Sequence, residues 1–162
     1  MNFIFGDNIN TDLITPGRYN ITTDAQELAK IAFIEHRPEF AKQVKVGDYV
    51  IGGRNFGCGS SRETAATALK ACGIKAVIAQ SFARIFYRNS MNQGLMLVIA
   101  DTDGIAEEDV LEIDVEKQRV INKTKKKKIT AEIPPIMAKL VDVGGITNYI
   151  QKNGLGSISK LF

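Results

Sequence analysis

The segment from residue 48 to residue 79 constrains the fold more than any other part of the sequence. An apolar run, 48–52, leads through a glycine-rich turn into an alanine-rich stretch, 61–71, and a second apolar run follows at 75–79. Short apolar runs bounded by glycine predict buried strands, and the alanine-rich stretch predicts a helix that Gly73 ends. This strand–helix–strand order predicts two parallel strands joined by a right-handed crossover. The predicted fold class is therefore α/β with a βαβ core.

The rest of the chain is expected to form short helices and strands within one domain. Apolar residues at helical spacing predict five further helices: 25–34, 38–43, 82–91, 136–143 and 146–152. Alternating or continuous apolar runs predict five further strands: 2–5, 95–99, 110–115, 118–122 and 128–133. No internal repeat or linker divides the sequence, so a single domain over residues 1–162 is expected.

Three details of these elements can be tested against a structure. The strands at 110–115 and 118–122 are separated by two residues, which predicts an antiparallel hairpin. In the helix over 82–91, Ile85 is expected to face the core together with its aromatic neighbours. The tail, 153–162, is expected to be loosely held.

The composition is typical of a soluble globular protein. Of the 162 residues, 44% are hydrophobic and 24% are charged. The net charge is only +3, and the basic run from Lys125 to Lys128 contains no aromatic residue, so a solvated turn and no nucleic-acid partner are expected. No apolar run reaches transmembrane length and the N-terminus lacks the basic region of a signal peptide, so neither membrane binding nor export is expected.

The chain is poor in cysteine and histidine. It has two cysteines, Cys58 and Cys72, which are far apart in the sequence, and a single histidine, His36, in a polar stretch. These residues cannot supply a zinc or iron–sulfur site by themselves. A disulfide framework is not expected either, which favours a reducing, cytoplasmic compartment.

The glycine-rich turn at 55–63 predicts an anion site. Gly57 and Gly59 allow a sharp turn and a close approach of the backbone to a ligand. Ser60 is expected to cap the following helix, with Glu63 completing a capping box. The N–H groups at the start of that helix and the guanidinium of Arg62 both favour a carboxylate or a phosphate.

Several interpretations of Ser60 are open at this point. It is either a helix cap and nothing more, or a reactive serine. A serine-hydrolase triad is disfavoured because the only histidine is His36, and neither a G-x-S-x-G elbow nor a phosphate-binding loop is present. A serine oxygen stabilised in an anion site, acting as a base, remains. The pair Thr11-Asp12 is by itself most typical of a turn.

Three stretches of the sequence point to one family. They are DNINTDLITPGRY at 7–19, NFGCGSSRE at 55–63, and SFARIFYRN at 81–89 followed by Asn92 and Gly94. In these motifs the chain resembles the small subunits of isopropylmalate isomerases, which are similar to the swivelling C-terminal domain of aconitase. The resemblance extends over nearly the whole chain, and its GSSRE motif is highly specific in this context.

The resemblance implies an aconitase-type swivelling domain with a β/β/α, barrel-like fold that forms half of an enzyme. A large subunit would carry the [4Fe–4S] cluster, so this chain would bind no cofactor itself. The implied reaction, a step of leucine biosynthesis, dehydrates a 2-hydroxy diacid and rehydrates the unsaturated intermediate at the neighbouring carbon. Purified alone, such a subunit is expected to form homo-oligomers.

The same resemblance implies a role for each residue of the predicted site. Ser60 and Asp12 correspond to catalytic residues, Ser60 to the base that takes a carbon-bound proton and Asp12 to an active-site acid of the first loop. Arg62 corresponds to a ligand of a substrate carboxylate, with Ser61 beside it, and Thr11 adjoins Asp12 in the substrate site. A carbon-bound proton is only weakly acidic. A serine can remove it only when the serine oxygen is strongly activated and water is excluded.

The stretch Tyr19-Asn20-Ile21-Thr22 bears on the identity of the substrate. In related homoaconitases it resembles Tyr-Leu-Arg-Thr, whose arginine binds an additional carboxylate. Ile21 stands in place of that arginine. Because an apolar side chain cannot compensate a buried carboxylate but can pack against an isopropyl group, 3-isopropylmalate is the expected substrate.

Three alternatives remain at the level of the sequence. Two are enzyme subunits, one of a homoaconitase and one of a hydro-lyase that acts on citraconate or methyl-substituted malates. The third is a non-catalytic module that binds an anion without a large subunit.

Overall fold

A single curled sheet of seven strands organises the structure, a computed structural model that describes residues 1–161. Its strand order is β1-β2-β3-β4-β7-β6-β5. The first four strands are parallel: β1 (Asn2–Ile4), β2 (Tyr49–Ile51), β3 (Ala76–Ala79) and β4 (Leu97–Ala100). The other three are antiparallel to their neighbours: β5 (Leu111–Asp114), β6 (Arg119–Asn122) and β7 (Lys127–Glu132).

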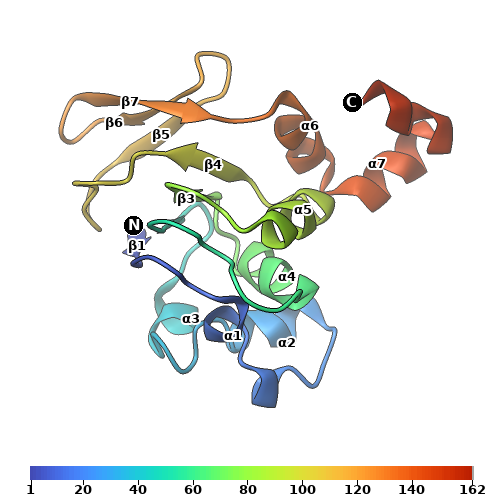
Figure 1. Ribbon diagram of the computed structural model, residues 1–162, viewed down its shortest axis with the longest axis horizontal. Coiled ribbons are helices and arrows are strands. Elements are labelled where there is room, and N and C mark those ends of the chain that lie inside the picture. The colour runs from blue at the N-terminus through green and yellow to red at the C-terminus, as the bar shows by residue number, and fades with distance from the viewer. Residues whose placement is uncertain (162) are drawn as a thin grey trace.

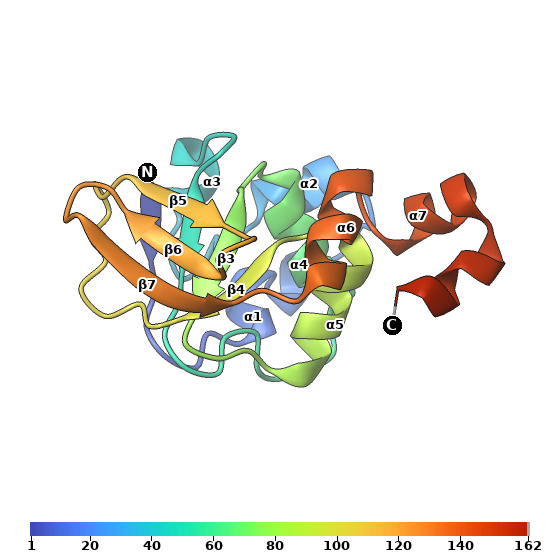
Figure 2. The same ribbon diagram turned by 90° about the horizontal axis from the view of Figure 1, so that it is seen from above.

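Short helices occupy the connections and the C-terminal part. The α-helices are α1 (Thr11–Ile14), α2 (Ala25–Lys30), α3 (Phe40–Gln43), α4 (Glu63–Ala71), α5 (Arg84–Gln93), α6 (Pro135–Val143) and α7 (Ile146–Asn153). Two 3₁₀ helices are present, η1 (Gly17–Tyr19) and η2 (Leu155–Lys160). Within residues 1–161 no helix is long and apolar enough to cross a bilayer. Figure 2 shows α7 and η2 standing to one side of the sheet.

The βαβ unit forms as the sequence predicts. β2 and β3 run parallel with Val50 opposite Val77, and α4 connects them. The buried face of α4 is made of three alanines and Leu69. Because alanine side chains are small, the helix can lie close to its neighbours in the core, where packing density is high.

Each face of the parallel strands has its own hydrophobic core. Val50 and Val77 belong to the cluster that includes the helix residue Phe86. Their neighbours Ile51 and Ile78 point the other way, as side chains in a strand alternate, and they cluster with Val120 of β6. The sheet therefore curls so that β5–β7 cover one face of β1–β4 while helices cover the other, as Figure 1 shows. This is a β/β/α arrangement of the barrel-like kind that was expected.

Hydrogen bonds close the open side of this half-barrel. The side-chain amide of Asn2 in β1 donates to the carbonyls of Ala106 and Asp109, both at 2.8 Å. Tyr49 of β2 reaches the carbonyl of Leu111 in β5 with its hydroxyl, at 3.4 Å. The strands at the two ends of the sheet order are thereby connected through the segment that precedes β5.

Two of the predicted helices differ from the structure for a tertiary reason that the contacts show. The helix predicted over 25–34 ends at Lys30, because Phe33 adopts a positive φ of 57° and stacks its buried ring on Phe5 at 4.2 Å. The helix predicted from residue 82 begins at Arg84, since Phe82 forms an isolated parallel bridge with Phe56. Ile85 is 40% exposed and does not face the core as predicted.

The lysine run differs from the expected solvated turn in two ways: Lys127 and Lys128 belong to β7, and Lys125 pairs with a buried carboxylate. Lys125 donates from its Nζ to the carboxylate of Asp109, at 2.9 Å. Asp109 is buried and also accepts from Asn122 at 2.6 Å and from the backbone of Ala106 at 2.9 Å. The ammonium of Lys125 and these donors hold the pKa of Asp109 at about 2. The other lysines of the run are exposed.

We expect Lys125→Met to lower the melting temperature at neutral pH, because it removes the cation from a buried carboxylate. Lys126→Met is the matched control and should leave the melting temperature close to that of the wild type. The pKa of Asp109 is lowered in the folded state, so the stabilisation is fully present above the unfolded pKa of about 4 and is lost as pH falls toward 2. Thermal unfolding at a series of pH values tests this, and equal melting temperatures for the two variants at neutral pH would contradict it.

Candidate active site

The predicted site residues other than Ile21 gather where the parallel strands end. Loops that follow β1 and β2 lie side by side there, joined by Gly57 N–H donating to Ile9 at 2.7 Å and Thr11 N–H donating to Cys58 at 2.8 Å. Asn10 and Cys58 form an isolated parallel bridge. In open α/β sheets the carboxyl ends of the strands are the usual position of a ligand site.

Two glycines shape the turn between β2 and α4. Gly57 has a φ of 79°, and a Cβ placed on it would lie 2.2 Å from the ring of the buried Phe86. Gly59 has a φ of 90°, but its nearest neighbour would be the Cβ of Asn10 at 3.3 Å. Both positions need glycine for the backbone conformation, and Gly57 needs it for space as well.

The predicted capping box does not form. Arg62, not Ser60, precedes the first turn of α4, and no side chain caps the helix. Arg62 has an extended backbone, with φ −115° and ψ 104°, so Ser60 lies two residues too early to reach the helix N–H groups. Glu63 accepts a hydrogen bond from Gln93 at 2.5 Å instead. Ser60 and Ser61 are both exposed, so their hydroxyls are accessible.

The guanidinium of Arg62 joins the predicted residues into one cluster. Its Nε donates to the hydroxyl of Ser60 at 3.0 Å, and its NH2 nitrogen forms an ion pair with Asp12 at 2.9 Å. Its NH1 nitrogen donates to the carbonyl of Thr15 at 3.2 Å. A guanidinium has more N–H groups than these contacts use, so it can also bind an anion.

Thr11 and Asp12 lie in the first turn of α1, not in a simple turn. The side chain of Asn10 caps this short helix by accepting from Leu13 N–H. Thr11 is buried, and its hydroxyl donates to the carbonyl of Ser60 at 2.8 Å and lies 3.5 Å from the Ser60 hydroxyl. Asp12 has a 59% exposed side chain and accepts from Gly17 N–H at 3.0 Å.

Ile21 lies apart from the cluster, on the loop that follows η1. Its side chain is 90% exposed at the rim of a cavity of about 560 Å³. The neighbouring Asn20 anchors this loop by donating to the hydroxyl of Thr64, at 3.1 Å. Because Thr64 is the second residue of α4, the loop and the helix that follows Arg62 are directly connected.

Sequence reasoning missed Thr15, Gly17 and Thr64, which complete the cluster. Thr15 supplies a carbonyl to Arg62, and its hydroxyl lies 3.3 Å from that of Thr64. The only signal for Thr15 and Gly17 was their position inside the first motif. Thr64 belongs to a stretch that was interpreted only as helix.

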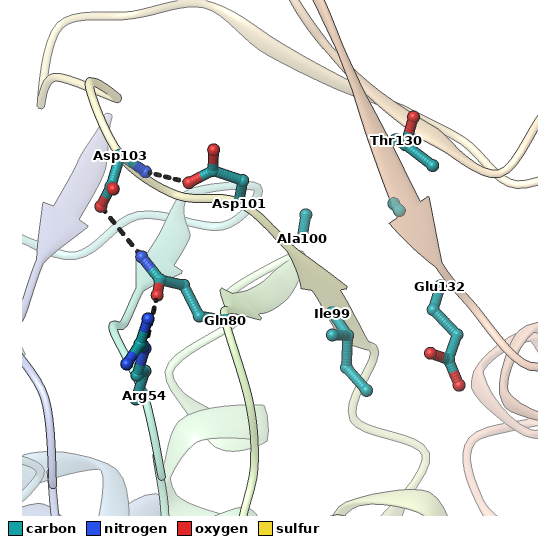
Figure 3. A pocket seen from close by; sticks show the side chains of 9 residues that line it. Arg54, Gln80, Ile99, Ala100, Asp101, Asp103, Thr130 and Glu132 are labelled. Atoms are coloured by element: carbon teal, nitrogen blue, oxygen red, sulfur yellow. Dashed lines mark hydrogen bonds between the residues drawn. The ribbon is translucent and has the colours of Figure 1, made fainter.

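A second, separate hollow lies between the ends of β4 and β7 (Figure 3). Its volume is about 530 Å³, and it is lined mainly by polar residues. Gln80 connects its two charged sides, donating to Asp103 at 2.9 Å and accepting from Arg54 at 3.4 Å. None of the predicted site residues lines it.

The side chains of this chain do not fit an iron–sulfur cluster. Among residues 1–161 no three His, Cys, Asp or Glu side chains are grouped to hold a metal ion. A cluster is held by thiolates, yet burial raises the pKa of Cys72 to about 12. We therefore derive no catalytic step through a cluster held by this chain.

The fold defines a class of protein, an α/β domain of the swivelling type, in which the cluster around Arg62 lies at the carboxyl ends of the parallel strands. The family model for the aconitase C-terminal domain matches residues 3–102. The chain therefore belongs to the aconitase C-terminal domain family, and both the expected fold and the family resemblance are confirmed.

Individual relatives agree with this assignment. The chain is 50% identical to the 3-isopropylmalate dehydratase small subunit 2 of Archaeoglobus fulgidus, over 93% of this chain and 92% of that protein. It is 49% identical to the methanogen homoaconitase small subunit of Methanocaldococcus jannaschii, over 93% and 89%. The crystal structure of a 3-isopropylmalate dehydratase (leuD) from Methanocaldococcus jannaschii superposes with a TM-score of 0.89 at 48% identity, covering 98% of this chain and 96% of that one.

We expect Gly57→Ala to destabilise the fold more than Gly59→Ala. Both changes place a Cβ at a positive φ, which costs about 1–2 kcal/mol. Only Gly57→Ala also pushes an atom into a packed aromatic ring, which should add roughly 1–3 kcal/mol. Urea unfolding of the two variants measures the difference. Equal free energies of unfolding would show that the ring of Phe86 can move aside without loss of stability.

Proposed function

We propose that this chain is the small subunit of a 3-isopropylmalate dehydratase, interconverting 2-isopropylmalate and 3-isopropylmalate in leucine biosynthesis. It acts as one swivelling domain over residues 1–162, in a hydro-lyase whose large subunit carries a [4Fe–4S] cluster. The observation that supports this most is the 3.0 Å contact between the exposed Ser60 hydroxyl and Arg62, in a chain without a cluster site among its described residues. The small-subunit relatives support the heteromeric assembly.

In this proposal Ser60 is the base that accepts the carbon-bound proton. A serine oxygen becomes basic enough only when its negative charge is stabilised. The Nε–H of Arg62 points at that oxygen, and the hydroxyl of Thr11 lies 3.5 Å from it. The proton moves from the substrate carbon to the deprotonated Ser60 Oγ while the hydroxyl leaves the neighbouring carbon, which gives the unsaturated intermediate. Rehydration returns the proton to the carbon that lost the hydroxyl and adds a hydroxyl to the carbon that lost the proton.

The other site residues bind and orient the diacid. Arg62 binds a substrate carboxylate with its remaining N–H groups, and the exposed Ser61 hydroxyl is placed beside it. Asp12 is the second catalytic residue, and its ion pair with Arg62 also fixes the direction of the guanidinium. Thr11 holds the turn by its hydrogen bond to the Ser60 carbonyl.

The exposure of this cluster accounts for the need for a partner. In solvent, water would compete for Arg62 and for the Ser60 oxygen. This would weaken both the binding of the substrate carboxylate by Arg62 and the contact between Arg62 and Ser60. Closure of the large subunit over the carboxyl ends of β1 and β2 would exclude that water. A cluster on that subunit would supply Lewis-acid chemistry for the departure of the hydroxyl.

Ser60→Ala should abolish most isomerase activity when the chain is combined with a cognate large subunit. Loss of a catalytic base lowers the rate by about 10²–10⁴-fold. Ser159→Ala, in the C-terminal segment, is the matched control and should behave as the wild type. Full activity of Ser60→Ala would exclude the proposed base, and a wild-type chain that bound the diacid but never yielded an active enzyme would favour the non-catalytic module.

The exposure of Ile21 is consistent with a role in choosing the substrate. A 90% exposed isoleucine on an anchored loop offers apolar surface that an isopropyl group can cover. A homoaconitase is the second candidate because one relative carries that name. A hydro-lyase for other methyl-substituted malates would use the same apolar contact.

We expect Ile21→Arg to shift the preference of the reconstituted enzyme toward a substrate with an additional carboxylate. The new guanidinium would bind that carboxylate, and the contact with the isopropyl group would be lost, so the ratio of kcat/KM values should change by about tenfold or more. Val46→Arg is a matched control, since Val46 is an apolar residue that is 89% exposed. An unchanged ratio for Ile21→Arg would contradict the proposed role.

The proposal also covers self-association and cellular location. Without its partner, exposed apolar side chains such as Leu155 favour self-association into homo-oligomers. A reducing, cytoplasmic location is proposed because the two cysteines are not disulfide-bonded.

A further inference from the structure

Gly17 is a glycine whose backbone does not require glycine. It begins η1, and it is not among the glycines with a positive φ. Another residue could therefore adopt its backbone conformation without strain. The reason for glycine at this position must lie in the space that a side chain would occupy.

That space is taken by the guanidinium of Arg62. A Cβ on Gly17 would lie 3.1 Å from both terminal nitrogens of Arg62 and 3.5 Å from Oδ1 of Asp12. Contacts of 3.1 Å between carbon and nitrogen are tighter than ordinary van der Waals contact, so either the guanidinium or the loop would have to move. The backbone of Gly17 thus lies directly against the group that holds the anion site together.

The guanidinium is already fixed on its other sides. Ser60, Thr15 and Asp12 each accept one of its hydrogen bonds. The N–H of Gly17 donates to the same Asp12 oxygen that pairs with Arg62. Gly17 therefore contacts Arg62 directly and orients the carboxylate that Arg62 binds.

We propose that Gly17 is a positioning residue for substrate binding, because its missing side chain lets the first loop close on Arg62 and set the direction of the free N–H groups. This inference rests on the proposed function, in which Arg62 binds a substrate carboxylate. Gly17 also accepts a hydrogen bond from the backbone of Asn20, at 3.2 Å. One residue thus connects the carboxylate site to the loop that carries Ile21.

The functional test compares Gly17→Ala with Gly6→Ala in the enzyme reconstituted with a large subunit. Gly6 follows β1 and has no positive φ, and a methyl group placed on it would have no neighbour within 4 Å, so it is a matched control. Gly17→Ala should raise KM for the diacid by roughly tenfold, because a small misplacement of a binding group is costly. Its kcat should change less than KM, because the methyl group meets the terminal nitrogens of Arg62 and not the Nε that contacts Ser60. A KM equal to that of Gly6→Ala would overturn the proposal.

A second measurement uses the chain alone and needs no activity. Gly17→Ala should lower the melting temperature when Arg62 is present and should have a much smaller effect in an Arg62→Lys background, where the terminal nitrogens are gone. Equal effects in both backgrounds would overturn the proposal, because the methyl group would then act on something other than Arg62. An unfolded Gly17→Ala chain would overturn it too.

The two measurements separate this inference from the function on which it rests. If the wild-type chain never forms an active isomerase with any large subunit, the proposed function fails, whatever the melting temperatures show. If the wild-type enzyme is active and Gly17→Ala leaves KM unchanged, only the role of Gly17 fails.

Discussion

Two backbone hydrogen bonds, from Gly57 to Ile9 and from Thr11 to Cys58, hold the candidate active site together. They continue the parallel alignment of β1 and β2 beyond the last residues of the strands. Without them, the first loop and the glycine-rich turn would be independent segments that lie far apart in the sequence. With them, Asp12 and Arg62 meet at ion-pair distance, and the hydroxyl of Thr11 reaches the carbonyl of Ser60.

Much of this arrangement could be predicted because its determinants are local. The strand–helix–strand order at 48–79 is encoded by composition and by glycine at the ends, and the parallel pairing of β2 and β3 confirms it. The hairpin of β5 and β6 forms as predicted, although its connection, 115–118, has four residues where two were expected. That the motifs at 7–19 and 55–63 lie together in space was implied only by the family resemblance, since no local pattern connects residues so far apart. The catalytic and substrate-binding roles of the site residues stay predictions.

The failures all come from distant contacts that override a local preference. Ser60 and Glu63 have the spacing of a capping box, but Arg62 is drawn into an extended conformation by partners on the first loop. Phe33 leaves a helical pattern because its ring is buried against Phe5. Lys125 belongs to a run that looks solvated, and nothing in the run indicates that a buried carboxylate 16 positions away needs its charge. Such effects depend on which side chains meet after folding. Local patterns in a single sequence do not predict those contacts.

The contrast between Ile21 and Gly57 has a consequence for how such proteins diverge. Gly57 cannot change without disturbing Phe86 and the packing around it, so the turn that presents Ser60 is constrained by the core. Ile21 contributes almost nothing to the core because its side chain is in solvent. On the proposed function, a new substrate preference can therefore arise through one substitution with little loss of stability. Substrate selectivity and stability can then change almost independently during evolution. A protein of this kind can acquire activity on a new diacid without first becoming more stable.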